Sequence, residues 1–296
     1  MYEHISSNKR KSIFLIALFF IIIVSLGYFF GFYIGDIFTG VFVAVLISTI
    51  MLLISYYSGD KLILKMSHAI PADRKKYPHL VNTVEGLAIA AGIQTPKIYV
   101  INDAAINAFA TGRNPKNASV TVTTGAIERL KRDELEGVLA HELAHIRNYD
   151  IRMMMLVVIL VGIIALLSDF FLRTLIYGKG RRGVKASGII GVLLIIIGLV
   201  LALLAPLISQ LIKFAVSRQR EFLADADGAL LSRNPQGLAN ALKKISNDKE
   251  PLVEAANKAT AHLFIENPLR VFKGRINTLF STHPPIDERI KRLQKD

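Results

Sequence analysis

Four long runs of apolar residues dominate the pattern of hydrophobic and polar positions along the chain. They extend over Ile13–Phe30, Ile37–Tyr57, Met153–Leu172 and Gly188–Ile212. A helix needs about 20 apolar residues, at a rise of 1.5 Å each, to cross a hydrocarbon core of about 30 Å. We therefore predict four membrane-spanning helices in two hairpins. Buried helices of a soluble protein are the alternative, which suits the third run best because it contains Asp169.

Basic residues flank the first hairpin on both sides, and none lies between its two helices. Cytoplasmic loops carry an excess of Lys and Arg, so both ends of this hairpin are predicted to face the cytoplasm. The loop of the second hairpin is basic as well, although alternation would place it outside. Either the first helices dominate the orientation, or the last two segments do not fully cross. The residues concerned are Lys9, Arg10 and Lys11, then Lys61, Lys65, Arg74, Lys75 and Lys76, and in the second loop Arg173, Lys179, Arg181, Arg182 and Lys185.

The apolar runs divide the chain into four parts. Residues 1–57 form an N-terminal transmembrane hairpin, and residues 153–212 form a second hydrophobic hairpin. Between and after them lie two polar parts, residues 58–152 and 213–296. If the second hairpin begins and ends on one side of the membrane, these two parts meet and form one domain.

The polar parts contain patterns of both helices and strands. Tyr77–Ala91 and Leu130–Tyr149 are predicted to be helices. Pro96–Asn102 is rich in β-branched and aromatic residues, and Ser119–Thr124 alternates Val with Thr, so both are predicted to be strands. Helices dominate the last part, which closes with an amphipathic helix ending near Leu293. The expected fold is a mainly α membrane protein with an α+β domain that holds a small sheet.

The composition limits the possible chemistry. Hydrophobic residues make up 52% of the 296 residues and charged residues 20%, which excludes an intrinsically disordered chain. Cysteine is absent, which excludes disulfides, thiolate nucleophiles and cysteine-bound metals. The net charge of +13 is compatible with nucleic acid or with a membrane surface. Because the basic residues flank the apolar runs, we predict contact with the lipid bilayer and no nucleic-acid binding.

The most informative motif is the sequence H-E-L-A-H at residues 141–145. His141 and His145 are four residues apart, so on a helix they share one face and can grip a single Zn²⁺ ion. Glu142 lies beside that face, where its carboxylate can take a proton from water. A chance occurrence on an amphipathic helix is the alternative, and the small neighbours Ala140 and Ala144 argue against it because they allow close approach.

A catalytic zinc site needs a third protein ligand. The metzincin pattern is excluded, because this chain has Asn148 and Ile151 where that pattern requires Gly and His. A charged segment directly after the fourth apolar run offers Glu221 and Asp225, four residues apart. Glu221 as a ligand and Asp225 as a hydrogen-bond partner of a histidine form a coherent set. The alternative is a solvated helix start at the membrane interface.

These motifs resemble the HtpX family of membrane-bound zinc metalloproteases, which are relatives of the CAAX prenyl endopeptidases and of the Oma-type proteases. The resemblance rests on H-E-L-A-H at 141–145 and on S-R-Q-R-E-F-L-A-D-A-D at 217–227. Further matches are Asn107–Gly112, Ala261–Pro268 and Ser281–Pro285. The resemblance extends over essentially the whole chain, including both hydrophobic hairpins.

The resemblance implies a gluzincin-like protease domain that binds one Zn²⁺ per chain through His141, His145 and Glu221, with Glu142 as general base. It also implies a multi-pass protein of the cell membrane whose active site faces the cytoplasm. Its implied role is quality control, in which it cleaves misfolded or damaged membrane proteins. Substrate, cleavage preference and oligomeric state do not follow from the sequence.

Less direct implications concern the substrate cleft. The segment Asn107, Ala108, Phe109 and Ala110 is expected to be an edge strand beside the cleft, where a substrate peptide can add by backbone pairing. His283 either stabilises the developing oxyanion or caps and packs a helix before Pro284. His262 is expected to be structural.

Two rival functions come from other classes. A non-catalytic scaffold or chaperone-like factor would hold zinc in a closed site with four protein ligands, the fourth being His262, His283 or Asp225. A transporter would use the intramembrane Asp169, but that residue lies near the end of its run, where a charge is tolerated at low cost.

Overall fold

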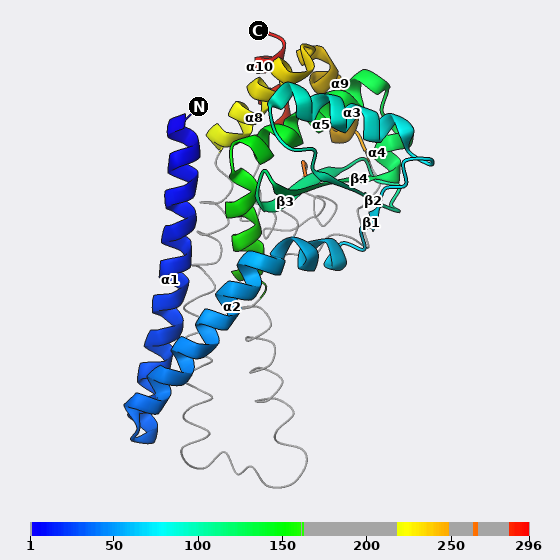
Figure 1. Ribbon diagram of the computed structural model, residues 1–296. Coiled ribbons are helices and arrows are strands. Elements are labelled where there is room, and N and C mark those ends of the chain that lie inside the picture. Colours follow the sequence, from blue (N-terminus) through cyan, green and yellow to red (C-terminus); the bar gives the residue numbers. More distant parts are fainter. Residues whose placement is uncertain (1, 161, 163–217, 249–262, 266–283, 296) are drawn as a thin grey trace.

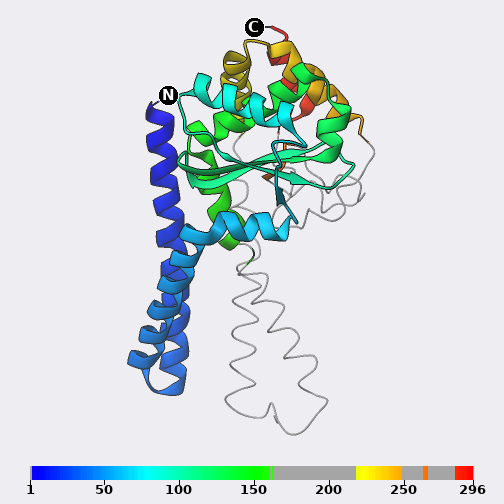
Figure 2. The ribbon, with the colours of Figure 1, turned by 45° about the vertical axis from the view of Figure 1, so that its right-hand side comes forward.

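Two long helices and a mixed lobe of helices and strands make up the part of the chain that the computed structural model describes, residues 2–160, 162, 218–248, 263–265 and 284–295 (Figure 1). Helices α1 (Tyr2–Ile34) and α2 (Ile37–Met66) run side by side as a hairpin. The lobe lies at the end of the hairpin that holds the start of α1 and the end of α2 (Figures 1 and 2).

The hairpin is built for a lipid environment. Ile5–Phe29 and Ile37–Met66 are each long and apolar enough to cross a membrane. Large side chains on their surfaces are exposed, among them Phe38 at 81%, a pattern that suits a lipid-covered surface. The two helices approach closely at Gly40, where an added Cβ would lie 2.5 Å from the backbone oxygen of Gly27. The first two predicted spans are thus present as helices.

The second predicted hairpin falls mostly outside the described residues. Of the run Met153–Leu172, residues 153–160 belong to a helix over 150–160, whereas Gly188–Ile212 is not described. The described start of the third run packs inside the protein, because Met155 and Val158 share a buried cluster with residues of α2 and of the sheet. A four-span arrangement therefore remains a prediction.

A four-stranded mixed sheet forms the centre of the lobe. Its strands are β1 (Ile70–Pro71), β2 (Lys97–Ile101), β3 (Ala108–Asn114) and β4 (Asn117–Thr123), in the order β1-β2-β4-β3. β2 and β4 are parallel and the other neighbours are antiparallel. β3 is consequently at one edge of this sheet.

Helices pack on the sheet and build the core. Val100, Val120 and Val122 point from the strands into a cluster that also includes residues of α3, α5, α9 and α10. The opposite face carries Ile101 and Phe109, which meet α2 and the helix over 150–160. The helices not yet given bounds are α3 (Pro78–Ala91), α4 (Thr124–Arg129), α5 (Arg132–Arg147), α8 (Arg218–Ser232), α9 (Pro235–Ser246) and α10 (Ile286–Leu293).

Most predicted elements of the lobe are confirmed. The two predicted helices correspond to α3 and α5, the two strands to β2 and β4, and the terminal amphipathic helix to α10. β1 and α4 were not predicted because both are short: β1 has two residues and α4 has six. The side chain of Thr123 caps the start of α4. A helical protein with a small mixed sheet is therefore the observed fold class.

Candidate metal centre

Helix α5 carries the histidine pair at the middle of the lobe. Its apolar side chains Leu139, Leu143 and Ile146 are fully buried, so the helix is fixed by the core. His141 and His145 are also buried, and their Nε2 atoms lie 3.2 Å apart. The imidazole rings meet edge to face, with centroids 4.7 Å apart.

Helix α8 brings a carboxylate to this pair. The oxygens of Glu221 lie 3.8 Å from Nε2 of His141 and 3.6 Å from Nε2 of His145. Ligand atoms bound tetrahedrally at the usual zinc distances would be separated by about 3.3 Å from one another. The three side chains therefore offer a buried triangle of donor atoms close to the size that a single metal ion requires.

Two further carboxylates hold the outer nitrogen of each histidine. Nδ1 of His141 lies 3.0 Å from Asp225, and Nδ1 of His145 lies 3.0 Å from Asp150. An ionised carboxylate only accepts hydrogen bonds, so each Nδ1 must donate its proton. In neutral imidazoles the two facing Nε2 atoms then carry lone pairs, which repel at this distance unless a proton or a metal ion lies between them. The donor set therefore fits a metal ion.

A buried arginine from α10 completes the surroundings of Asp225. The guanidinium of Arg289 donates to both oxygens of Asp225, at 2.8 Å and 2.6 Å, and lies 3.8 Å from Glu221. Burial alone would raise the pKa of Asp225, but the charge and hydrogen bonds of Arg289 hold that pKa well below its usual range. Asp225 thus contacts the outer side of His141 and does not face the triangle as a fourth ligand would.

The surroundings of the metal centre raise the pKa values of both His145 and Glu142. Burial lowers the pKa of His145, but the hydrogen bond to Asp150 and the charge of Glu221 outweigh burial and raise that pKa to about 9 in the metal-free protein. Burial also raises the pKa of Glu142, which is next to the histidines and feels their charges. A carboxylate with a raised pKa is a stronger proton acceptor than an exposed glutamate.

The two helices of the centre are in close contact at a glycine. A Cβ added to Gly228 of α8 would lie 2.9 Å from the backbone nitrogen and 3.0 Å from the Cα of His141. Any larger residue must push α8 away from α5, because both contacts are to backbone atoms. Gly228 therefore sets how near Glu221 comes to the histidines.

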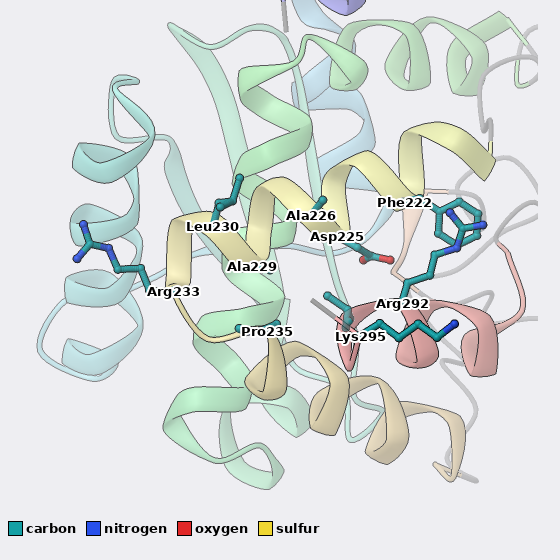
Figure 3. Close-up of a pocket in the computed structure, with 10 residues that line it drawn as sticks. Phe222, Asp225, Ala226, Ala229, Leu230, Arg233, Pro235, Arg292 and Lys295 are labelled. Atoms are coloured by element: carbon teal, nitrogen blue, oxygen red, sulfur yellow. The ribbon is translucent and has the colours of Figure 1, made fainter.

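A cavity of about 730 Å³ lies on another side of α8, between α8, the start of α9 and α10 (Figure 3). The guanidinium of Arg292 lies 3.7 Å from the ring centroid of Phe222 at its wall. His141, His145 and Glu221 do not line this cavity, which shares only Asp225 with the residues around the metal triangle. It is therefore separate from the place where the donor atoms converge.

The predicted cleft residues lie in different places. Ala108, Phe109 and Ala110 belong to the edge strand β3, whereas Asn107 precedes it. The backbone oxygen of Asn107 accepts from the backbone N–H of Thr123, and its own N–H donates to the hydroxyl of that threonine. The backbone oxygen of Ala108 accepts a hydrogen bond from Ile265. His262 and His283 lie outside the described residues.

Two residues of the centre were missed by sequence reasoning. Asp150 lies only five positions after His145, but it follows Tyr149, whose φ of +62° ends α5 and redirects the chain. Arg289 lies on a short amphipathic helix, where an arginine is usually solvated. The repeated pairing of metal-bound histidines with carboxylates was a usable signal for Asp150, and we found none for Arg289.

Comparison with known proteins decides the family. The model of peptidase family M48 matches residues 74–296, which include both histidines, Glu221 and Arg289. The chain belongs to peptidase family M48. It is 47% identical over 296 residues to a protein called Protease HtpX homolog from Caldanaerobacter subterraneus subsp. tengcongensis, with 99% of this chain and 97% of the relative covered. A Protease HtpX homolog from Dictyoglomus turgidum is 46% identical, with 99% and 94% covered.

The fold also matches that of a solved structure. The crystal structure of S. mikatae Ste24p matches with a TM-score of 0.50 at 19% sequence identity, with 99% of this chain and 67% of that chain covered. The chain thus has a Ste24-like fold, and the expected membership of the HtpX family is confirmed. As an M48 member it is a membrane metalloprotease that acts on peptide or protein substrates.

Proposed function

We propose that this protein is a zinc-dependent endopeptidase in which His141, His145 and Glu221 hold one Zn²⁺ and Glu142 acts as general base. The observation that carries the proposal is the buried triangle of donor atoms, with two Nε2 atoms 3.2 Å apart and a carboxylate beside both. Two histidines and one glutamate would supply three protein ligands, the number typical of catalytic zinc sites, whereas structural sites supply four.

The chemistry follows from the positions of the side chains. Zinc, when bound, supplies a Lewis acid that polarises the scissile carbonyl and makes water a stronger acid. Glu142 takes the proton from the attacking water and returns it to the leaving amine. Its burial favours both steps, because the raised pKa lets the carboxylate hold a proton during the reaction. Asp225 and Asp150 keep the imidazoles oriented throughout.

The substrate is proposed to bind as an added strand at the edge of β3. β3 packs against α5, and its position at the edge of the sheet leaves one side of the strand, as far as the described residues go, for a further chain. At Ala108 this side is already used by Ile265, so a peptide would pair from Ala110 onwards.

The cellular role proposed here is quality control at the cytoplasmic face of the cell membrane, with misfolded or damaged membrane proteins as substrates. Its support is the lobe at the end of the α1–α2 hairpin that is flanked by Lys9, Arg10 and Lys11, the arrangement that the positive-inside rule predicts for a cytoplasmic domain. Residues 58–152 and 213–296 are proposed as the two halves of one protease domain, with residues 153–212 as a further membrane hairpin.

The direct test replaces Glu142 by glutamine in the full-length protein. Glu142→Gln keeps the size of the side chain but removes the base, so bound zinc should remain at one ion per chain. Cleavage of an unfolded membrane-protein substrate should fall at least about a hundredfold, within the range for loss of a general base. Zinc is measured by elemental analysis and cleavage by gel electrophoresis.

A matched control is Glu136→Gln, the same change on the same helix but away from the histidine face. It should leave both zinc content and cleavage unchanged. Undiminished cleavage by Glu142→Gln would refute the role of Glu142, and a wild-type protein that binds no zinc would refute the proposed metal.

A further inference from the structure

The first membrane helix carries a buried polar residue that reaches the metal centre. Asn8, Ser12, Leu15 and Phe19 are buried at positions that recur every three to four residues, so they form one stripe of α1. Its C-terminal part, Leu15 and Phe19, is apolar, as expected for a helix packed in a membrane protein. Asn8 is only 4% exposed, and burial of an amide is costly unless its hydrogen-bonding groups are satisfied.

The side-chain amide of Asn8 donates hydrogen bonds to two residues that directly follow α5. Its Nδ2 donates to Oδ1 of Asp150 at 2.7 Å and to the backbone oxygen of Asn148 at 3.0 Å. The other carboxylate oxygen of Asp150, Oδ2, is the atom that accepts from Nδ1 of His145 at 3.0 Å. One carboxylate therefore connects the α1 amide directly to an imidazole of the metal triangle.

Asp150 has a competing partner on its Asn8 side. The guanidinium of Arg220 lies 3.9 Å from Oδ1, the same oxygen that accepts from Asn8, and Arg220 is itself almost buried. Without the amide of Asn8, this charge would attract the carboxylate and rotate it, which would move Oδ2 away from His145. Asn8 thus holds the carboxylate in the rotamer that serves the histidine.

Asn8 is also connected to α8 by way of Asn148. Asn148, whose backbone oxygen accepts from Asn8, donates through its side chain to Asp227 of α8 at 2.8 Å. Beside it, Nζ of Lys9 lies 4.6 Å from the ring centroid of Tyr149, the residue with positive φ between Asn148 and Asp150. The start of α1 is therefore docked on residues 148–150, which follow α5 and are hydrogen-bonded to α8 through Asn148.

We propose that Asn8 is a positioning residue for metal binding, through which the first membrane helix fixes the orientation of His145 by way of Asp150. The inference rests on the proposed ligand set and extends it to a residue outside the M48-matched region, which begins at residue 74. A displacement of α1 relative to the lobe would be felt directly by the metal ligand.

The experiment measures how fast full-length protein, reconstituted in lipid nanodiscs and loaded with Zn²⁺, loses its zinc to an excess of chelator. Asn8→Ala should release zinc about tenfold faster than wild type, the lower end of the range for groups that support a metal ligand. Asp150→Asn should release it faster still. At saturating zinc, Asn8→Ala should lower kcat for a peptide substrate and leave KM unchanged, because the proposed substrate site is at β3 and not at α1.

Ser12→Ala is the matched control. Ser12 lies in the same buried stripe, but its hydroxyl donates within the helix, to the backbone oxygen of Asn8. It should therefore show wild-type zinc release. If Ser12→Ala and Asn8→Ala accelerate release equally, the effect is general loosening of α1 and the proposal fails.

An isosteric variant keeps the test decisive if Asn8→Ala does not fold. Asn8→Asp preserves the size of the side chain but replaces the donating amide by an acceptor opposite Oδ1 of Asp150 and the backbone oxygen of Asn148. It should therefore also release zinc faster than wild type, and release at the wild-type rate would overturn the proposal. Zinc release needs no substrate, so a failure here is separate from a failure of Glu142→Gln to abolish cleavage.

Discussion

At the scale of single residues, the centre is a set of charges that balance one another away from water. Arg289 neutralises the charge of Asp225. Asp225 in turn orients His141, and Asp150 orients His145. Breaking a buried pair by removing one partner costs more than the pair contributes, because the remaining charge is left in a medium of low dielectric. The loss of one of these side chains should therefore destabilise the others.

This balance predicts a pH dependence of zinc binding. In the metal-free protein the pKa of His145 is raised to about 9, so its imidazole is protonated at neutral pH and must lose that proton to bind a metal. Zinc affinity should rise about tenfold for each pH unit between 7 and 9 and level off above that range. Competition titrations of the wild-type protein with a chelator would measure it, because Glu142 is itself one of the charges that raise the pKa of His145. An affinity that stays constant between pH 7 and pH 9 would contradict the protonated state of His145.

Sequence reasoning at this scale located the residues of a motif but not their partners. His141, His145 and Glu142 follow from helical periodicity, and Glu221 follows from charge density directly after an apolar run. Arg289 could not be found this way, since its role depends on α10 packing against α8, a contact between distant parts of the chain. Asn8 was hidden in the same manner, at the edge of what looked only like a membrane helix.

At the scale of elements, the geometry of the triangle is set by the distance between α5 and α8. Gly228→Ala should destabilise the protein by about 1–3 kcal/mol, the usual cost of overpacking, and weaken zinc binding because Glu221 moves outward. Gly86→Ala on α3 is the matched control, as an added Cβ there meets nothing within 4 Å. It should be neutral or stabilising by up to about 1 kcal/mol. Denaturant melts and zinc titrations of both variants distinguish a local clash from a general effect of alanine.

Elements with a strong local pattern were predictable and their pairing was not. α3 and α5 show apolar positions at helical spacing, and β2 and β4 show β-branched residues between turns. The sheet order β1-β2-β4-β3 places β4 between two strands that precede it in the chain, and it depends on contacts that no local pattern encodes. β3 was expected only through family resemblance, because its small and polar residues Ala110, Thr111 and Gly112 do not resemble a strand.

At the scale of the whole molecule, the catalytic lobe and the membrane hairpin form one mechanical unit. The lobe contacts α2 through Phe109 and the start of α1 through Asp150, so the protease core is docked on both membrane helices. The apolar runs alone could predict that the chain enters the membrane. They could not predict that residues 153–160 pack inside the protein, because a buried helix and a membrane helix have the same composition.

The orientation of the hairpin can be tested by single-cysteine labelling, as the chain contains no native cysteine. Asp36→Cys, in the turn between α1 and α2, should react with a membrane-impermeant maleimide on intact cells. Lys75→Cys, exposed on the lobe, should react only after permeabilisation, and the reverse pattern would place the protease domain outside. In the same assay, Arg181→Cys reacts from outside if the second hairpin crosses fully and only after permeabilisation if it does not.

The order of the centre's residues along the chain has a consequence for synthesis. His141 and His145 come first, Glu221 follows only after residues 163–217, and Arg289 comes later still. A ribosome that has just finished α5 has made both imidazoles but neither the carboxylate that closes the proposed triangle nor the arginine that neutralises Asp225. With the proposed ligand set, a nascent chain at this stage lacks hydrolytic competence, which begins only when the later helices have emerged and folded.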